Sequence, residues 1–280
     1  MFFKPLDRMW ERVETAKDHS DTDLFLSLMY LGEMTLKLTA VGLVAAINDG
    51  KERHRYRQHY QLVRASGIGD WSKVIDEVLT GASSQHLSTY AYKEQNELIS
   101  VNKAGTWQYN AVNLITECLS AIDLQTEAAS KKVSARQWFQ LFTNLRNKTR
   151  AHGAIPSRKY SEINNNLEES MLAIIQNFSL FQRPWAYLHQ NLSGKYRVTK
   201  WSPRAETLDF LKVRHNRDIK LPNGIYIHFD ETQEINGLVK IELIDSDADA
   251  SDFFFANGGF NGKRYVVNPK NWTQKYTDIF

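Results

Sequence analysis

The sequence predicts an α+β protein in which an all-helical domain is followed by a small antiparallel β domain. Before about residue 190, apolar residues recur at the three- and four-residue spacing of helices, and Gly and Pro are scarce. After residue 191, short alternating runs are separated by turn pairs such as Asn223-Gly224 and Asn236-Gly237. We therefore predict an all-α domain over residues 1–190 and a β-rich accessory domain over residues 191–280.

The first domain contains seven segments with helical periodicity. They are residues 6–17, 23–48, 51–65, 71–79, 109–124, 135–152 and 160–182. Segment 23–48 is the most apolar and is long enough to span a membrane. However, Glu33 and Lys37 lie in its middle, four residues apart, so we interpret it as a buried core helix and expect no membrane contact. Pro184 ends the last segment, and we expect a short helix from there through His189.

The second domain contains six short runs that predict strands. They are residues 196–200, 210–213, 225–229, 238–244, 253–255 and 264–267. Its aromatic residues, including Phe260 and Tyr265, are expected to form its core, with a docking surface for a regulatory protein partner as the alternative. The acidic run 245–252 alternates like a calcium loop. Ala250 and Ala256 stand where an EF-hand needs Gly and Glu, so we expect a solvated loop.

The composition predicts a folded protein of a reducing compartment. Hydrophobic residues make up 42% of the 280 and charged residues 24%, which excludes disordered and collagen-like classes. The single cysteine, Cys118, allows neither an intrachain disulfide nor a cysteine-based zinc site, and we expect it to fill the core. The N-terminal residues show no signal-peptide pattern, so we expect a cytoplasmic protein. Without a phosphate-binding glycine loop or metal-ligand spacing among its histidines, we expect no metal or other cofactor.

The charge of this chain is concentrated in one segment. The formal net charge is +3, from 35 basic and 32 acidic residues. Residues 131–160 carry eight basic side chains and no acid, so the rest of the chain is net −5. A second basic cluster lies at residues 51–57. Basic residues interleaved with aromatic ones favour a nucleic-acid partner, although a solvated helix face also explains such runs.

Segment 135–152 has clear end signals and lies inside this basic segment. Ser134 and Gln137 have the spacing of a capping box, and Gly153 follows where a helix favours a left-handed residue. An apolar stripe leads into a basic last turn; it consists of Trp138, Leu141, Phe142 and Leu145. The stripe should face a core, so the basic last turn of the helix is available for a catalytic site.

The end of this segment reads Leu145-Arg146-Asn147-Lys-Thr-Arg-Ala-His152-Gly153. It resembles the signature of the HEPN superfamily, whose RNases carry an Arg, usually a polar neighbour, four to six intervening residues and a His. Arg146, Asn147 and His152 match, with five residues between Arg and His, and the resemblance covers roughly residues 20–190. It implies a HEPN-like helical bundle and a homodimer with a composite RNase site at its two-fold interface. It also implies a toxin or antiphage-defence role.

The same Arg–His spacing occurs three more times. Arg12/His19 and Arg183/His189 have Val13 and Pro184 after the Arg, where the signature has a polar residue. The pair Arg53/His59 lies in a basic helix and is the serious rival. Only Arg146/His152 combines Asn after the Arg, an apolar helix before it and Gly after the His.

Metal-independent RNA cleavage needs these residue types. A histidine, which titrates near neutrality, can take the 2′-OH proton, and an arginine fork can stabilise charge on the phosphate. Asn147 could orient either group. Around a straight α-helix Arg146 and His152 would lie about 120° apart, so one protomer alone makes a poor site. We expect RNA binding by further basic residues, namely Lys148, Arg150, Arg158, Lys159, Arg53, Arg55 and Arg57.

The sequence leaves a second function open. Arg146 could pair with an acid on a neighbouring helix, and His152 could be an ordinary residue of a helix C-terminus. The chain would then be a catalytically inactive HEPN-like dimerisation or sensor module that binds a protein or nucleic-acid partner.

Overall fold

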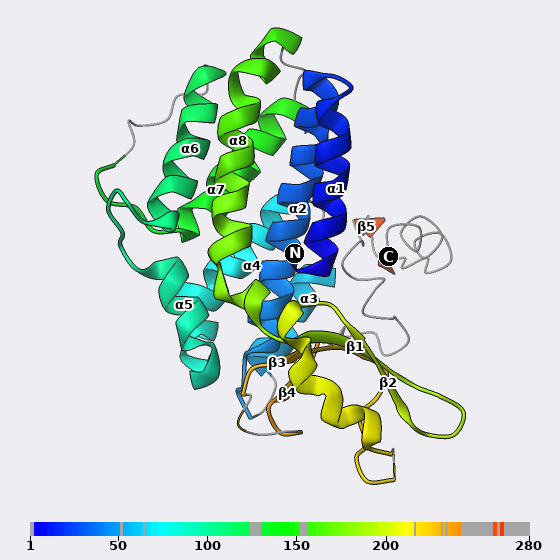
Figure 1. Ribbon diagram of the computed structural model, residues 1–280. Helices are drawn as coiled ribbons and strands as arrows, with labels where there is room; N and C mark the ends of the chain where they lie inside the picture. Colours follow the sequence, from blue (N-terminus) through cyan, green and yellow to red (C-terminus); the bar gives the residue numbers. More distant parts are fainter. Residues whose placement is uncertain are drawn as a thin grey trace. The chain divides into compact units, whose positions relative to one another are not determined.

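The computed structural model describes residues 3–50, 53–63, 65, 67–123, 130–151, 156–215, 217–230, 232, 235–241, 260–261 and 264–265. The fold is α+β, with helices first and a four-stranded antiparallel sheet after them, as predicted (Figure 1). The chain forms two compact units. We call residues 6–37 with 93–178 the helical unit, and residues 1–5, 38–92 and 179–280 the mixed unit. Helix α2 (Asp21–Ala45) contributes residues to both.

The helical unit contains most of α1 (Lys4–Lys17), the first part of α2, and most of α5 (Tyr92–Ile99). It also contains α6 (Trp107–Ala121), α7 (Arg136–Arg146) and α8 (Ser157–Asn177). Four of these helices were predicted over most of their length, as was α2, whereas α5 was missed. In Figure 1 α6, α7 and α8 lie side by side.

Close packing joins the helices of this unit. A Cβ atom on Gly32 of α2 would lie 2.3 Å from the Phe142 ring of α7, so only glycine permits this approach. The indole of Trp138 donates to Ser170 Oγ at 2.8 Å, and Ser170 Oγ donates to the Ala111 carbonyl at 2.7 Å. This chain of hydrogen bonds connects α7, α8 and α6 inside the core.

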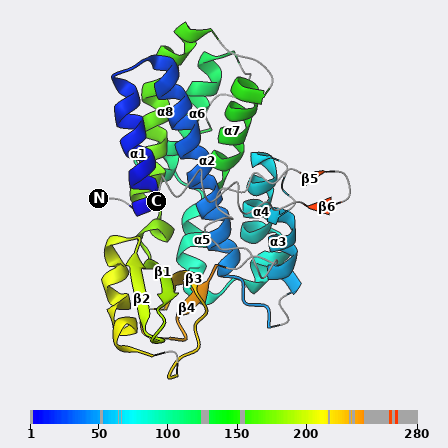
Figure 2. The same ribbon diagram turned by 90° about the vertical axis from the view of Figure 1, so that its right-hand side faces the viewer.

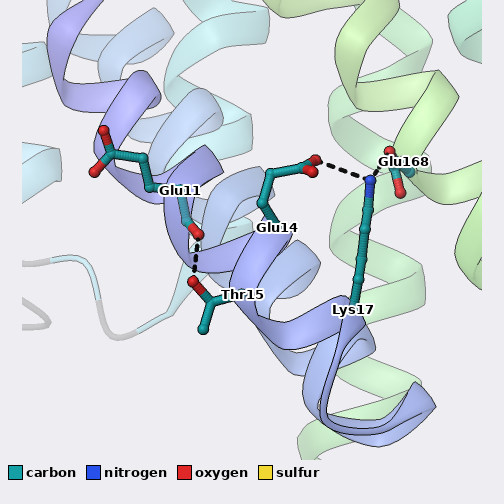
Figure 3. Close-up of polar contacts among 5 residues, drawn as sticks. All are labelled: Glu11, Glu14, Thr15, Lys17 and Glu168. Atoms are coloured by element: carbon teal, nitrogen blue, oxygen red, sulfur yellow. Dashed lines mark hydrogen bonds and ion pairs between the residues drawn. The ribbon is translucent and has the colours of Figure 1, made fainter.

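A charged contact joins α1 to α8. Lys17 Nζ lies 2.8 Å from Glu14 and 2.7 Å from Glu168, as Figure 3 shows. Burial lowers the pKa of Lys17, but the hydrogen bonds to Glu14 and Glu168 outweigh it, so its pKa is raised. Lys17 Nζ also lies over the Trp10 ring, 5.3 Å from its centroid. Lys17 therefore stays protonated and holds the end of α1 on α8.

The helical part of the mixed unit is built from short elements. They are α3 (Arg53–Val63), α4 (Ile68–Thr80) and the 3₁₀ turns η1 (Ala82–His86), η2 (Thr89–Ala91) and η4 (Ser179–Gln182). The sequence predicted α3 and α4 but not η1 or η2. Figure 2 shows α3 and α4 as neighbours.

The sheet of this unit has the order β2-β1-β3-β4, all antiparallel. Its strands are β1 (Trp185–Gln190), β2 (Tyr196–Lys200), β3 (Gly224–His228) and β4 (Leu238–Lys240). A separate hairpin pairs β5 (Phe260–Asn261) with β6 (Arg264–Tyr265). Strand β2 was predicted with its observed bounds, β4 and β6 fall inside predicted runs, and β3 overlaps the predicted run 225–229 with an offset of one residue.

Two predictions for this region are wrong. The short helix expected through His189 is strand β1, because its backbone pairs with β2 on one side and β3 on the other. Tertiary pairing here overrides local propensity. The strand expected over residues 210–213 belongs to the 3₁₀ helix η5 (Pro203–Val213). Ala205, Leu208 and Leu211 are fully buried at a three-residue spacing, which is the period of a 3₁₀ helix. The predicted strand 253–255 and the acidic run 245–252 lie outside the described residues.

Candidate functional site

Helix α7 ends at Arg146, the first residue of the predicted motif. The Ser134 amide donates to Gln137 Oε1 at 3.0 Å, which is one half of the predicted capping box. The Gln137 amide bonds to the Ser134 carbonyl rather than its hydroxyl, and the helix begins at Arg136. Trp138, Phe142 and Leu145 are completely buried. The apolar stripe thus fixes the rotation of α7 and the direction in which Arg146 leaves it.

The helix changes its winding at the motif. From Asn147 to Ala151 the backbone is π-helical, with hydrogen bonds that span five residues. Thr149 is buried, and its hydroxyl donates to the Leu145 carbonyl at 2.7 Å. The angular separation expected for a straight α-helix therefore does not apply after Asn147. His152 and the Gly153 stop signal lie outside the described residues.

Arg146 is held by an acid from another helix. Its Nε donates to Glu33 Oε1 of α2 at 2.8 Å, and its Nη1 lies 3.4 Å from Asn147 Oδ1. The side chain of Arg146 is 23% exposed and that of Glu33 only 10%. A carboxylate on Nε orients the guanidinium plane, and Asn147 engages one hydrogen of Nη1, so a second anion would meet the remaining Nη1 and Nη2 hydrogens.

Lys37 places a second positive charge near this ion pair. It lies one helical turn after Glu33 on α2 and is 5% exposed. Burial lowers the pKa of Lys37 to about 8; the charge of Arg146 lowers it too, while Glu33 raises it. At neutral pH the cluster of Glu33, Lys37 and Arg146 is therefore net positive, in surroundings where charge is weakly screened.

The predicted RNA-binding residues occupy two units. Lys148 and Arg158 of the helical unit are exposed. Lys159 is engaged instead, since its Nζ donates to the Ala121 carbonyl at 2.7 Å and lies 3.3 Å from Glu162. The side chain of Arg150 lies outside the described part of the chain.

On α3, in the mixed unit, Arg53 and Arg57 are exposed and Arg55 is half-buried. The structure thus brings Arg146 and Asn147 together with Glu33 and Lys37. Arg53, Arg55 and Arg57 belong to the mixed unit, so they are described separately from this cluster.

The three competing Arg–His pairs have other surroundings. His59 is buried, and burial together with the charge of Arg55 lowers its pKa to about 4, so it is neutral at physiological pH. The Arg12 guanidinium lies over the Tyr30 ring at 4.7 Å. Arg183 donates to the carbonyls of Phe229 and Tyr90. Arg12 and Arg183 are thus engaged by other groups, as Arg146 is by Glu33, and the buried, neutral His59 is the histidine of the Arg53 pair.

Three further predictions concern cofactors, Cys118 and α2. Within the described residues, no group of three or more His, Cys, Asp or Glu side chains is arranged to hold a metal ion. Cys118 is a buried core residue, as predicted, and burial raises its pKa to about 12. By length and composition, α2 is the one described helix that could cross a membrane, but 89% of its apolar window is buried within the protein.

The sequence analysis allowed for an acid on a neighbouring helix as the partner of Arg146, but it did not identify Glu33 as that acid or Lys37 as the neighbouring positive charge. Glu33 and Lys37 were noticed only as charges inside an apolar helix. Their burial was the available signal, because a buried charge needs a partner of opposite sign. Segment 131–160 contains eight basic residues and no acid, so the acidic partner of Arg146 had to lie elsewhere in the chain.

Comparisons with protein-family models, curated proteins and solved structures gave no match.

Proposed function

We propose that this protein is a metal-independent endoribonuclease of the HEPN type, cleaving RNA at a composite site in a homodimer. The observation that carries the proposal is the orientation of Arg146 by Glu33 through Nε, at the end of the helix that also carries Asn147 and precedes His152. The Nη1–Nη2 edge is the one that binds a phosphate through two parallel hydrogen bonds. Glu33 is a positioning residue in this scheme.

The reaction needs no group beyond these side chains and the RNA itself. His152 removes the proton of the 2′-OH, and the 2′ oxygen then attacks the adjacent phosphorus. The P–O2′ bond forms as the P–O5′ bond breaks, which leaves a 2′,3′-cyclic phosphate and a 5′ oxygen that takes a proton from protonated His152 or from water and becomes a hydroxyl. Arg146 stabilises the charge on the phosphate oxygens, and the positive charge of Lys37 adds to this field. By the same resemblance we propose a cytoplasmic toxin or antiphage effector.

Single substitutions test the chemistry. We expect Arg146→Ala and His152→Ala to reduce cleavage of single-stranded RNA by at least 100-fold, since each removes one of the two groups on which the reaction depends. His19→Ala is the matched control, because His19 is an exposed histidine of a competing Arg–His pair. A substrate with 2′-deoxyribose at the cleavage position should resist cleavage. Excess EDTA should not slow cleavage of the unmodified RNA by the wild-type protein. Full activity of His152→Ala would refute this proposal.

Mixing two inactive variants tests the composite site. If Arg146 of one protomer acts with His152 of its partner, a heterodimer of Arg146→Ala and His152→Ala retains one intact combination. We therefore expect each heterodimer in the mixture to cleave RNA at up to half of the rate of a wild-type dimer. No recovery in a mixture shown to contain heterodimers would refute a site shared in this way.

The ion pair also favours a second candidate, a catalytically inactive module. The Glu33 contact gives Arg146 a structural partner, which a binding or sensor protein equally requires. In that case the β-rich region would dock a regulatory protein. The two candidates differ in one measurement, since the inactive module cleaves no RNA and Arg146→Ala then changes only its stability.

A further inference from the structure

One face of α3 combines exposed arginines with exposed tyrosines. Arg53, Tyr56, Arg57 and Tyr60 follow one another at three- and four-residue spacing, so they lie on the same side of the helix. Tyr56 is 55% exposed and Tyr60 is 44% exposed. The opposite side is anchored in the mixed unit through the buried residues Gln58, His59 and Leu62.

The two tyrosine rings are arranged as neighbouring platforms. Their centroids lie 6.4 Å apart, and the ring planes differ by only 13°. Nearly parallel, solvent-accessible rings can stack with bases of a single strand, because every base has a π face. A salt-bridging protein surface or a lipid headgroup has no such requirement for parallel rings.

Charge and a cavity accompany these rings. Helix α3 contains three arginines and no acid. Beside Tyr60 lies an open cavity of about 370 Å³ lined by Tyr60 and Gln61 of α3 and by Asp70 and Lys73 of α4. Asp70 and Lys73 form an ion pair at 3.3 Å. The cavity thus offers donors and acceptors for a base edge next to an exposed ring.

We propose that this face of α3 and its cavity bind a segment of single-stranded RNA. Arg53 and Arg57 contact the phosphates, and Tyr56 and Tyr60 stack on successive bases. The choice of RNA rests on the proposed function, and the surface is a substrate-holding site in addition to the cleavage site. The arginines alone would suit any polyanion, whereas the paired rings select a nucleobase.

Fluorescence anisotropy with a labelled 12-nucleotide single-stranded RNA tests this surface. His152→Ala is used as the background so that the probe remains intact. Tyr56→Ala and Tyr60→Ala should each weaken binding about 5- to 150-fold, because stacking contributes about 1–3 kcal/mol per base. Tyr56→Phe and Tyr60→Phe keep the ring and should bind nearly as well. Tyr92→Ala is the matched control, since Tyr92 is also 44% exposed but lies on α5.

Inorganic polyphosphate as a second probe separates stacking from charge. Arg57→Ala should weaken binding of both RNA and polyphosphate, whereas Tyr56→Ala and Tyr60→Ala should weaken RNA alone. Unchanged RNA affinity in both tyrosine→Ala variants would overturn the proposal. So would an equal loss of polyphosphate binding, or tyrosine-dependent binding of anionic vesicles without RNA binding.

RNA binding by this surface can be tested separately from RNA cleavage at the proposed nuclease site. Arg146→Ala should reduce cleavage by at least 100-fold while RNA binding still depends on Tyr56 and Tyr60, and in the active protein Tyr60→Ala should raise KM more than it lowers kcat. Tyrosine-dependent RNA binding in a protein that cleaves no RNA would refute the nuclease but retain this surface. Cleavage that depends on Arg146, together with RNA binding that is unchanged by the tyrosine substitutions, would retain the nuclease and refute this surface.

Discussion

Replacing Lys37 by methionine should stabilise the protein at neutral pH. The pKa of Lys37 falls from 10.5 to about 8, chiefly because the ammonium is buried and also because Arg146 is near. A difference of about 2.5 pKa units corresponds to about 3 kcal/mol of unfavourable free energy for the protonated lysine in the folded state. Methionine has a similar volume and no charge, so Lys37→Met removes this cost.

The sign of the pH dependence follows from the two pKa values. Between about pH 8 and pH 10.5 the unfolded chain holds the Lys37 proton and the folded chain releases it, so folding becomes more favourable as pH rises. The advantage of Lys37→Met over the wild type is therefore greatest below pH 8 and disappears towards pH 10.5. Comparing two proteins that differ only at this residue cancels the titration of all other groups.

Urea unfolding followed by far-UV circular dichroism at pH 7, 8, 9 and 10 measures this difference. Lys73→Met is the control, because the Lys73 side chain is 79% exposed and its replacement should produce no comparable pH-dependent difference. A Lys37→Met protein that is less stable than the wild type at pH 7, or whose advantage does not change with pH, would refute the reasoning.

Three further outcomes are expected from buried groups. Gly32→Ala should destabilise the protein by about 1–3 kcal/mol in thermal or urea unfolding, because the new Cβ would overlap the Phe142 ring; an unchanged midpoint would contradict this packing. Burial and Arg55 lower the pKa of His59 to about 4, so stability should fall as pH drops from 6.5 towards 4, and this loss should be smaller in His59→Gln. Cys118 should resist a thiol reagent until the protein unfolds, since burial raises its pKa to about 12; rapid labelling of the native protein would show that the thiol is accessible.

The proposed cleavage site could be read from the sequence only in part. Arg146, Asn147 and His152 form a contiguous motif, so local spacing and the apolar stripe before them identified the helix and its end. The partner of Arg146 lies 113 residues earlier, on α2. No local pattern pairs Glu33 with Arg146, because that contact depends on how the two helices pack.

The misassigned elements have the same origin. Strand β1 begins directly after Pro184 in a sequence that also suits a short helix, and the pairing with β2 and β3 decides its state. In contrast, the period of three in η5 was present in the sequence, but only its last four residues were interpreted. The π-helical turn Asn147–Ala151 has no signal in the composition of the sequence.

The sequence by itself determined the α+β class, the order of helices before strands, most helix positions and the basic segment that contains the motif. These properties follow from periodicity and composition, which act over a few residues. Only the tertiary structure decided that Glu33 holds Arg146, that Lys37 is buried beside them, and that two tyrosines of α3 lie parallel on an exposed face. Such contacts depend on packing between helices and on exposure to solvent, which local sequence patterns do not specify.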